Sequence, residues 1–138
     1  MQNQHSTCLV SACLVGLCTR YDGQVKTTPD YPAPMQAMAW IPVCPEQLGG
    51  LPTTREAADI IGGDGADVLA GTAQVLTKSG LDVTAEFIRG AWQVLHIARL
   101  QNTSTAFLKA RSPSCAVHGR MGVTAALLQS AGVELIEL

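Results

Sequence analysis

The chain has 138 residues, of which 47% are hydrophobic and 14% are charged, and its formal net charge is −2. This length and apolar content predict a single domain over residues 1–138 with its own hydrophobic core. No basic block is present, so electrostatics gives no reason to expect tight binding to duplex nucleic acid. No apolar run approaches the roughly 20 residues that span a bilayer, and Met1–Thr7 lacks the hydrophobic region of a signal peptide. We therefore expect a cytoplasmic protein without a membrane partner.

Short apolar runs alternate with helical segments along the chain. The runs are too continuous for half-exposed antiparallel strands, and the helical segments are long enough to connect parallel strands. The expected strands lie near residues 7–12, 40–43, 105–109 and 133–136, and the expected helices include roughly 83–101 and 122–131. This order predicts an α/β fold, a Rossmann-like three-layer domain with a mainly parallel sheet.

The clearest helix begins at Asp82, a favourable N-cap residue, and is expected to end before Asn102. Its predicted buried face consists of apolar residues at helical spacing: Phe87, Ala91, Leu95 and Ala98. We expect this face to pack against the sheet.

Residues 53–80 are compatible with helix, hairpin or coil. A short helix over Glu56–Ile60 is possible, and the glycine-rich Gly62–Gly65 is expected to form a loop. Ala73–Leu76 has the character of a short strand, followed by a turn at Lys78–Gly80.

The stretch Ile41–Pro52 places reactive side chains at the end of a strand. Its apolar run stops at Cys44, because the next residue is a proline with no N–H for a central strand. Cys44 and Glu46 therefore lie just past a strand end, where open α/β sheets bind ligands. Gly49-Gly50 follows and permits close backbone approaches. A buried cysteine beside a tight turn would explain the same pattern.

The chain contains five cysteines: Cys8, Cys13, Cys18, Cys44 and Cys115. Their odd number, together with an expected reducing compartment, argues against a disulfide framework. No CxxC pair is present, which gives no support to a zinc ribbon or a thioredoxin motif. Any metal site must therefore be assembled by the fold.

Cys13, Cys44 and Cys115 each follow a predicted strand, the last after a few intervening residues. The carboxyl ends of parallel strands share one edge of a sheet, so these thiols are expected to converge. Soft sulfur ligands favour zinc, copper(I) or an iron–sulfur cluster, and three thiolates on a 4Fe–4S cluster leave one iron open to substrate. For each cysteine considered alone, a buried core position explains the pattern well, because free cysteine is among the most buried residue types.

Several motifs resemble those of one family, long catalogued as a domain of unknown function and associated with the thiouracil desulfidases. The motifs are Leu9–Gly16, Cys18–Gly23, Val43–Glu46 with Gly49–Pro52, Asp82–Thr84 and Ser112–Cys115. The resemblance covers nearly the whole chain. It implies a Rossmann-like α/β fold and a 4Fe–4S cluster, which an aerobic preparation is expected to lose or replace with another soft metal.

The resemblance also implies the site residues. Cys13, Cys44 and Cys115 would be the cluster ligands, and Glu46 and Ser112 the catalytic pair. The implied reaction removes sulfur from a small thiolated pyrimidine base or nucleoside, replacing C=S by C=O and releasing hydrosulfide without net redox change.

Two other functions remain open at this point. A non-catalytic metal or iron–sulfur binding module, such as a sensor or a sulfur carrier, would use the same three cysteines without needing Glu46. A cysteine-nucleophile enzyme without metal is the third possibility. Cys18 is a candidate fourth ligand or a spare thiol, whereas Cys8 is expected in the core.

The chain departs from the family pattern after Cys115, where Ala116 stands in place of the usual glycine. The loop over residues 116–120 is also shorter than in the family. We expect this loop to line the substrate pocket, so the difference bears on which substrate is bound.

Overall fold

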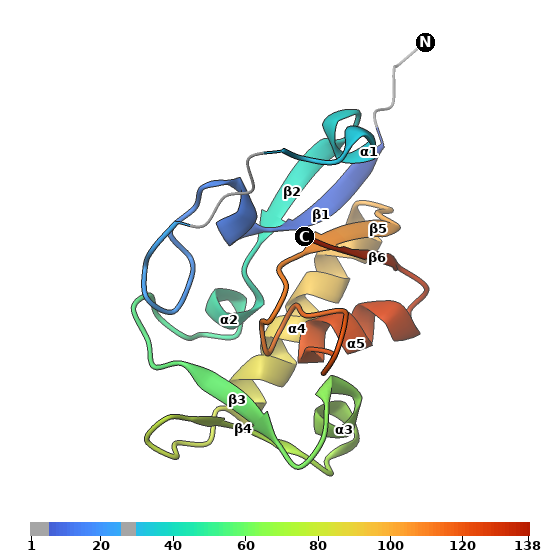
Figure 1. The fold of residues 1–138 in the computed structure, drawn as a ribbon. Coiled ribbons are helices and arrows are strands. Elements are labelled where there is room, and N and C mark those ends of the chain that lie inside the picture. Colours follow the sequence, from blue (N-terminus) through green and yellow to red (C-terminus); the bar gives the residue numbers. More distant parts are fainter. Residues whose placement is uncertain (1–5, 26–29) are drawn as a thin grey trace.

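The computed structural model describes residues 6–25 and 30–138, so Met1–His5 of the polar first segment lie outside the described residues. At its centre is a parallel sheet of four strands in the order β2-β1-β5-β6 (Figure 1). The strands are β1 (Thr7–Ser11), β2 (Ala39–Val43), β5 (Thr105–Leu108) and β6 (Glu134–Glu137). The four strand predictions are confirmed to within one residue at each end.

Helical elements cover both faces of this sheet (Figure 1). The helices α4 (Thr84–Leu100) and α5 (Val123–Ser130) pack on one face. The short 3₁₀ helix η1 (Ala12–Val15) and the helix α1 (Ala33–Gln36) pack on the other. The predicted Rossmann-like three-layer arrangement with a mainly parallel sheet is confirmed.

The central strand β1 is buried on both sides, as expected for a parallel strand covered by two layers. Leu9 packs into the larger core with α4 and α5. Cys8 and Val10 point the other way and pack with Leu14 of η1 and Met35 of α1. The prediction that Cys8 is a core residue is confirmed.

Helix α4 buries the predicted face together with two further residues, Gly90 and Val94: Phe87, Gly90, Ala91, Val94, Leu95 and Ala98. The helix begins at Thr84, and Asp82 accepts a hydrogen bond from the Thr84 backbone N–H at 2.9 Å. The N-cap position is Val83, so Asp82, the N-cap residue we predicted, lies one residue before it. Within the described ranges, no helix is long and apolar enough to cross a membrane.

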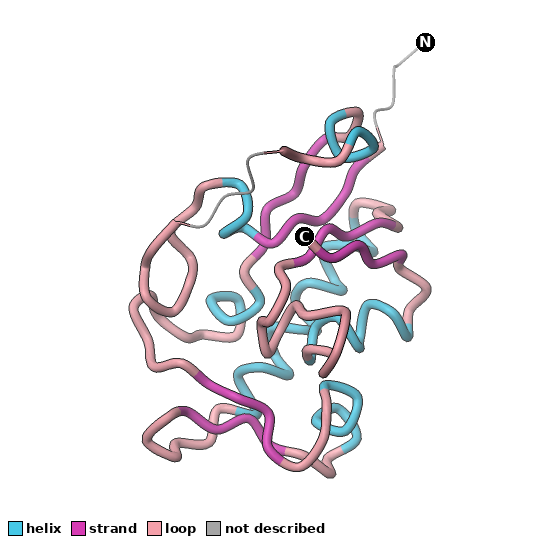
Figure 2. The backbone as a smooth tube through the Cα atoms, viewed as in Figure 1, coloured by secondary structure: helices cyan, strands magenta, loops and turns pink. Residues whose placement is uncertain are grey.

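Residues 58–77 include an antiparallel hairpin, which Figure 2 shows apart from the parallel strands. The strand β3 (Ala58–Ile61) pairs with β4 (Gln74–Thr77). The predicted strand near Ala73–Leu76 is confirmed, and the possible helix over Glu56–Ile60 is wrong. Ile60 and Val75 lie opposite each other and are both buried in the larger core, so burial across the hairpin outweighs the weak local preference for helix.

A short helix, α3 (Gly65–Ala70), begins at the end of the loop expected over Gly62–Gly65. Its start is a capping box, in which the Asp64 side chain accepts from the Asp67 N–H and the Asp67 side chain accepts from the Asp64 N–H. We did not predict this helix from the sequence, although two aspartates three positions apart mark its start.

Two glycines bring the helix α2 (Pro45–Leu48) into direct backbone contact with α4. A Cβ atom on Gly49 would overlap the carbonyl group of Glu86, and one on Gly90 would overlap the carbonyl group of Pro45. This contact fixes α2 at the carboxyl edge of the sheet, and α2 carries Glu46.

Gly90→Ala is expected to lower the free energy of unfolding by about 1–3 kcal/mol, because the added methyl group must push α2 away from α4. The same change in an ordinary helix interior stabilises by about 0.5–1 kcal/mol, so the sign of the effect is diagnostic. Urea denaturation measures it. Gln93→Ala, on the exposed face of α4, is the control and should change stability by less than about 0.5 kcal/mol. A stabilised Gly90→Ala variant would contradict the contact.

Candidate active site

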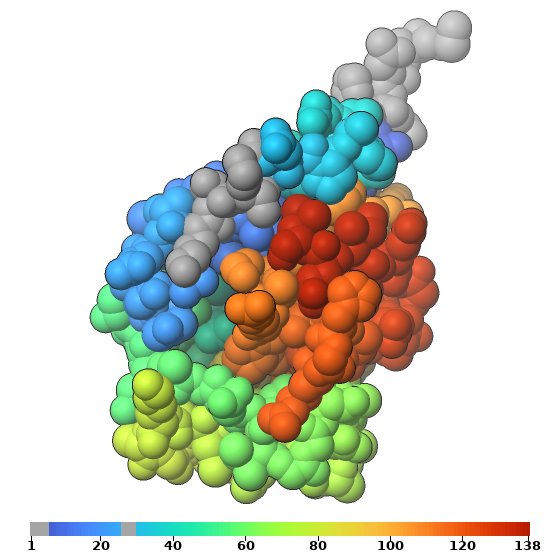
Figure 3. Space-filling view, in the orientation of Figure 1, coloured from blue at the N-terminus to red at the C-terminus, as the bar shows by residue number. Residues whose placement is uncertain are grey.

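A cavity of about 400 Å³ opens at the carboxyl edge of the parallel sheet. Its size is that of a small-molecule site. The lining residues belong to the segments 11–21, 43–46, 55–58 and 109–115. Figure 3 shows the hollow between the blue, green and orange segments of the surface. The position is the one where α/β sheets bind ligands.

All three predicted cysteines line this cavity. Cys13 lies in η1 directly after β1, Cys44 lies between β2 and α2, and Cys115 lies in the loop after β5. Their convergence follows from the parallel order of the strands, whereas their role as ligands remains a prediction. Cys18 is exposed and is not among the residues that line the cavity.

Burial raises the pKa values of two of these thiols, those of Cys13 and Cys115. Burial raises the pKa of Cys115 to about 12, and Cys13 and Cys44 add smaller effects in the same direction. Burial also raises the pKa of Cys13, which nearby Lys109 lowers and Cys44 raises. A coordinating metal reverses the effect of burial, because it deprotonates the thiol that it binds.

The donor set fits an iron–sulfur cluster. Within residues 6–25 and 30–138, no group of three or more His, Cys, Asp or Glu side chains is arranged to hold a single metal ion. In a 4Fe–4S cluster each thiolate binds a different iron atom, so its ligands are spaced more widely than those of one ion. The three thiols that line the cavity are the soft donors that such a cluster takes.

Glu46, in the first turn of α2, has both carboxylate oxygens hydrogen-bonded. Arg55 Nε donates to Oε1 at 3.0 Å, and Ser114 Oγ donates to Oε2 at 3.2 Å. The side chains of Glu46 and Arg55 are only 15% and 7% exposed. Our sequence analysis did not identify Arg55 or Ser114, although Ser114 belongs to the same short motif as Cys115.

Ser112 lines the cavity and shapes the turn that carries Cys115. Its Oγ accepts hydrogen bonds from the backbone N–H groups of Ser114 and Cys115, both at 3.1 Å. The hydroxyl proton of Ser112 can still be donated to a bound molecule. We predicted Glu46 and Ser112 as a catalytic pair. The serine that contacts Glu46 is instead Ser114, which is buried.

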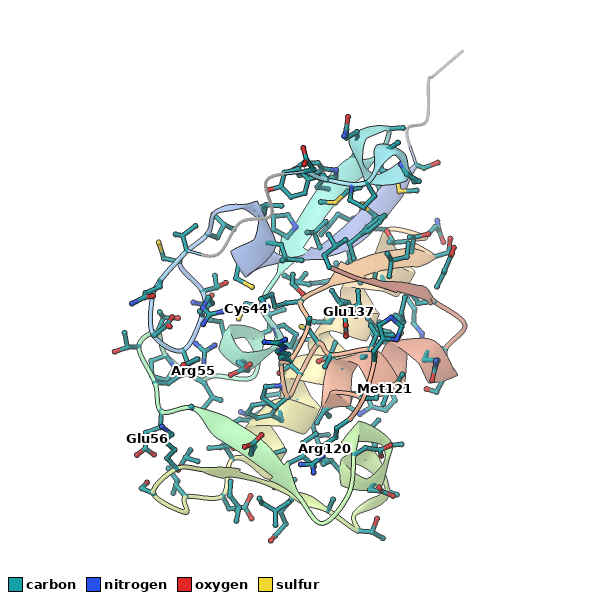
Figure 4. The ribbon with its side chains drawn as sticks, viewed as in Figure 1. Cys44, Arg55, Glu56, Arg120, Met121 and Glu137 are labelled. Atoms are coloured by element: carbon teal, nitrogen blue, oxygen red, sulfur yellow. The ribbon has the colours of Figure 1, made fainter. Side chains whose placement is uncertain are left out.

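The loop over residues 116–120 was expected to line the pocket, and this prediction is wrong for the cavity described here. The backbone N–H groups of Val117 and His118 donate to Glu137 Oε2 at 2.8 and 2.9 Å. Arg120 Nη1 donates to the Ile60 carbonyl at 2.7 Å. These bonds hold the loop toward β6 and β3, and Figure 4 shows Glu137 and Arg120 apart from Cys44 and Arg55.

Comparison with known proteins agrees with this geometry. The sequence model of the family described as 2-thiouracil desulfurase matches residues 8–137. "Uncharacterized protein YbbK" of Bacillus subtilis (strain 168) is 42% identical over 140 residues, which cover 93% of each chain. The solved structure of the "[4Fe-4S]-dependent thiouracil desulfidase TudS" is similar with a TM-score of 0.79 and 37% identity, covering 96% of this chain and 90% of that one. The chain belongs to the 2-thiouracil desulfurase family.

Proposed function

We propose that this protein is an iron–sulfur-dependent desulfidase. It converts the C=S group of a thiouracil-like base or nucleoside to C=O and releases hydrosulfide, without net redox change. The observation that carries the proposal is a single cavity that gathers three thiols and a carboxylate from the ends of three parallel strands. Membership of the 2-thiouracil desulfurase family and the likeness to TudS support it.

Cys13, Cys44 and Cys115 would hold a 4Fe–4S cluster through their thiolates. When bound, such a cluster supplies an iron without a cysteine ligand, a Lewis acid for the substrate sulfur. The protein contributes the enclosure, since Cys115 is buried and Cys13 and Cys44 are half-buried.

Glu46 is the residue placed to move a proton. Adding water across C=S and expelling sulfur requires that the water oxygen lose its protons as it bonds to carbon. A carboxylate held at the wall of the cavity accepts such a proton, and can return one to the leaving sulfur. The Ser112 hydroxyl, whose proton is not used within its turn, can donate to the substrate.

We propose the cytoplasm as the working compartment. All five cysteines are free, and Cys18 is exposed. Free thiols persist in a reducing environment, and a cluster with an open iron needs the same protection.

Anaerobic reconstitution with iron and sulfide, followed by incubation with 4-thiouracil, tests the proposal. We expect about four iron atoms per chain, and uracil and sulfide formed in equal amounts. A fully loaded protein that leaves free and nucleoside forms of thiolated pyrimidines intact would overturn the proposal in favour of a binding module. Turnover by an iron-free, colourless preparation would instead indicate a cysteine nucleophile.

A further inference from the structure

Arg55 makes a complete set of polar contacts beside the cavity. Besides its bond to Glu46, its Nη2 donates to the Thr19 carbonyl at 2.9 Å. Its Nη1 donates to the Pro52 carbonyl and to Thr53 Oγ1, both at 3.1 Å. A guanidinium buried to this extent needs acceptors in each direction, because leaving a buried charge unpaired is costly. These contacts fix the plane of the guanidinium group.

The fixed guanidinium in turn fixes Glu46. A carboxylate on a side chain with several rotatable bonds would otherwise sample several orientations at the cavity wall. Arg55 on Oε1 and Ser114 on Oε2 restrict it to one. Each carboxylate oxygen can accept more than one hydrogen bond, so both remain able to accept from a water molecule or a substrate.

The Glu46–Arg55 pair is also a partition between two cavities. A second cavity of about 190 Å³, with a largely apolar lining, lies beside the first, and Glu46, Arg55 and Ala58 line both. Arg55 is therefore an interior wall rather than a surface group. Removing the Arg55 side chain would leave a space that a small ion of guanidinium shape can enter.

We propose that Arg55 is a positioning residue of the desulfidase, which acts through Glu46 by holding the carboxylate in the orientation that takes the proton from water. The inference rests on the proposed function. It assigns no proton transfer to Arg55 itself. Arg55 Nη2 also lies 4.0 Å from Cys44 Sγ, so cluster retention must be measured alongside turnover.

Arg55→Ala, compared with the wild-type protein after anaerobic reconstitution, is expected to keep its iron and sulfide content and its visible spectrum. Its kcat for 4-thiouracil should fall by about 100-fold, the cost of misplacing a reacting group by roughly 1 Å, while KM changes little. Arg55→Lys should remain impaired, because an ammonium group cannot make the forked contacts of a guanidinium group.

Chemical rescue provides a measurement that a purely structural role would not change. Millimolar guanidinium is expected to restore part of the kcat of Arg55→Ala, whereas urea, which has a similar shape but no charge, is not. Arg120→Ala is the matched control, because Arg120 also donates to a backbone carbonyl but lies outside the cavity lining. It should have full activity and no response to guanidinium.

A crystal structure of cluster-free Arg55→Ala gives a readout that does not depend on turnover. We expect the Glu46 carboxylate to leave Ser114 and to return when guanidinium is soaked into the crystal. Full kcat in the variant, or a Glu46 that stays in place, would overturn the proposal, as would iron loss as the sole defect. If the wild-type protein fails to turn over, the proposed function is refuted, and the position of Glu46 in the variant still decides whether Arg55 orients it.

Discussion

Glu46→Gln is expected to abolish turnover of 4-thiouracil and to leave cluster loading unchanged. Glutamine has the same shape, and its amide oxygen can still accept from Arg55, but it cannot take a proton from water. Loss of a general base reduces kcat by about 10²–10⁴-fold. Uracil formation measures the loss, and iron and sulfide analysis of the same sample shows that the cluster is present.

Glu56→Gln is the control for this change. Glu56 is an exposed carboxylate that accepts from Ser79 Oγ at 2.8 Å, and Figure 4 shows it directed away from Cys44. It should retain wild-type kcat. Unchanged turnover in Glu46→Gln would show that Glu46 is not the general base and would remove the main argument against a non-catalytic binding module.

Serine in place of Cys13, Cys44 or Cys115 is expected to remove the cluster and, with it, the activity. A hydroxyl group is a hard, weakly acidic ligand and does not replace a thiolate on iron. Mutating residues that only support metal ligands lowers metal affinity or activity by about 10–100-fold. Loss of a ligand itself should therefore lower turnover by at least about 100-fold. Iron content and the visible absorption of the reconstituted variants measure cluster loss directly.

The control for the cysteine series is Cys18→Ser, since Cys18 is exposed and outside the cavity lining. It should bind iron and turn over substrate like the wild-type protein. Far-UV circular dichroism of each variant separates loss of the cluster from loss of the fold. If Cys18→Ser lost iron, Cys18 would have to be counted among the ligands.

The positions of the three cysteines could be predicted from sequence because they depend on a simple relation. Each follows a continuous apolar run, and parallel strands bring such run ends to one edge. The hairpin was not predictable in the same way. The short segment around Ile60 is apolar but has no strong local signal, and it becomes a strand only through its partner Val75.

The residues around Glu46 show the same distinction. Ser114 is 68 positions away from Glu46, and their hydrogen bond exists only because helix α2 meets the loop after β5. Arg55 is nearer in sequence, yet nothing in its neighbours indicates that its charge is directed inward. The loop over residues 116–120 was misplaced because Glu137, at the end of the last strand, draws its backbone away from the cavity.

The separation of the three thiols along the chain also bears on whether folding or metal insertion comes first. β1 must pair with both β2 and β5 before the three cysteine-bearing segments meet. The proposed metal site is therefore complete only after the sheet has formed. Small zinc modules work in the opposite order, with the metal organising an unfolded chain. Parallel pairings between distant segments form slowly, and the newly made chain spends that interval with unprotected thiols open to oxidation. With Cys13, Cys44 and Cys115 as the proposed ligands, cluster delivery follows folding.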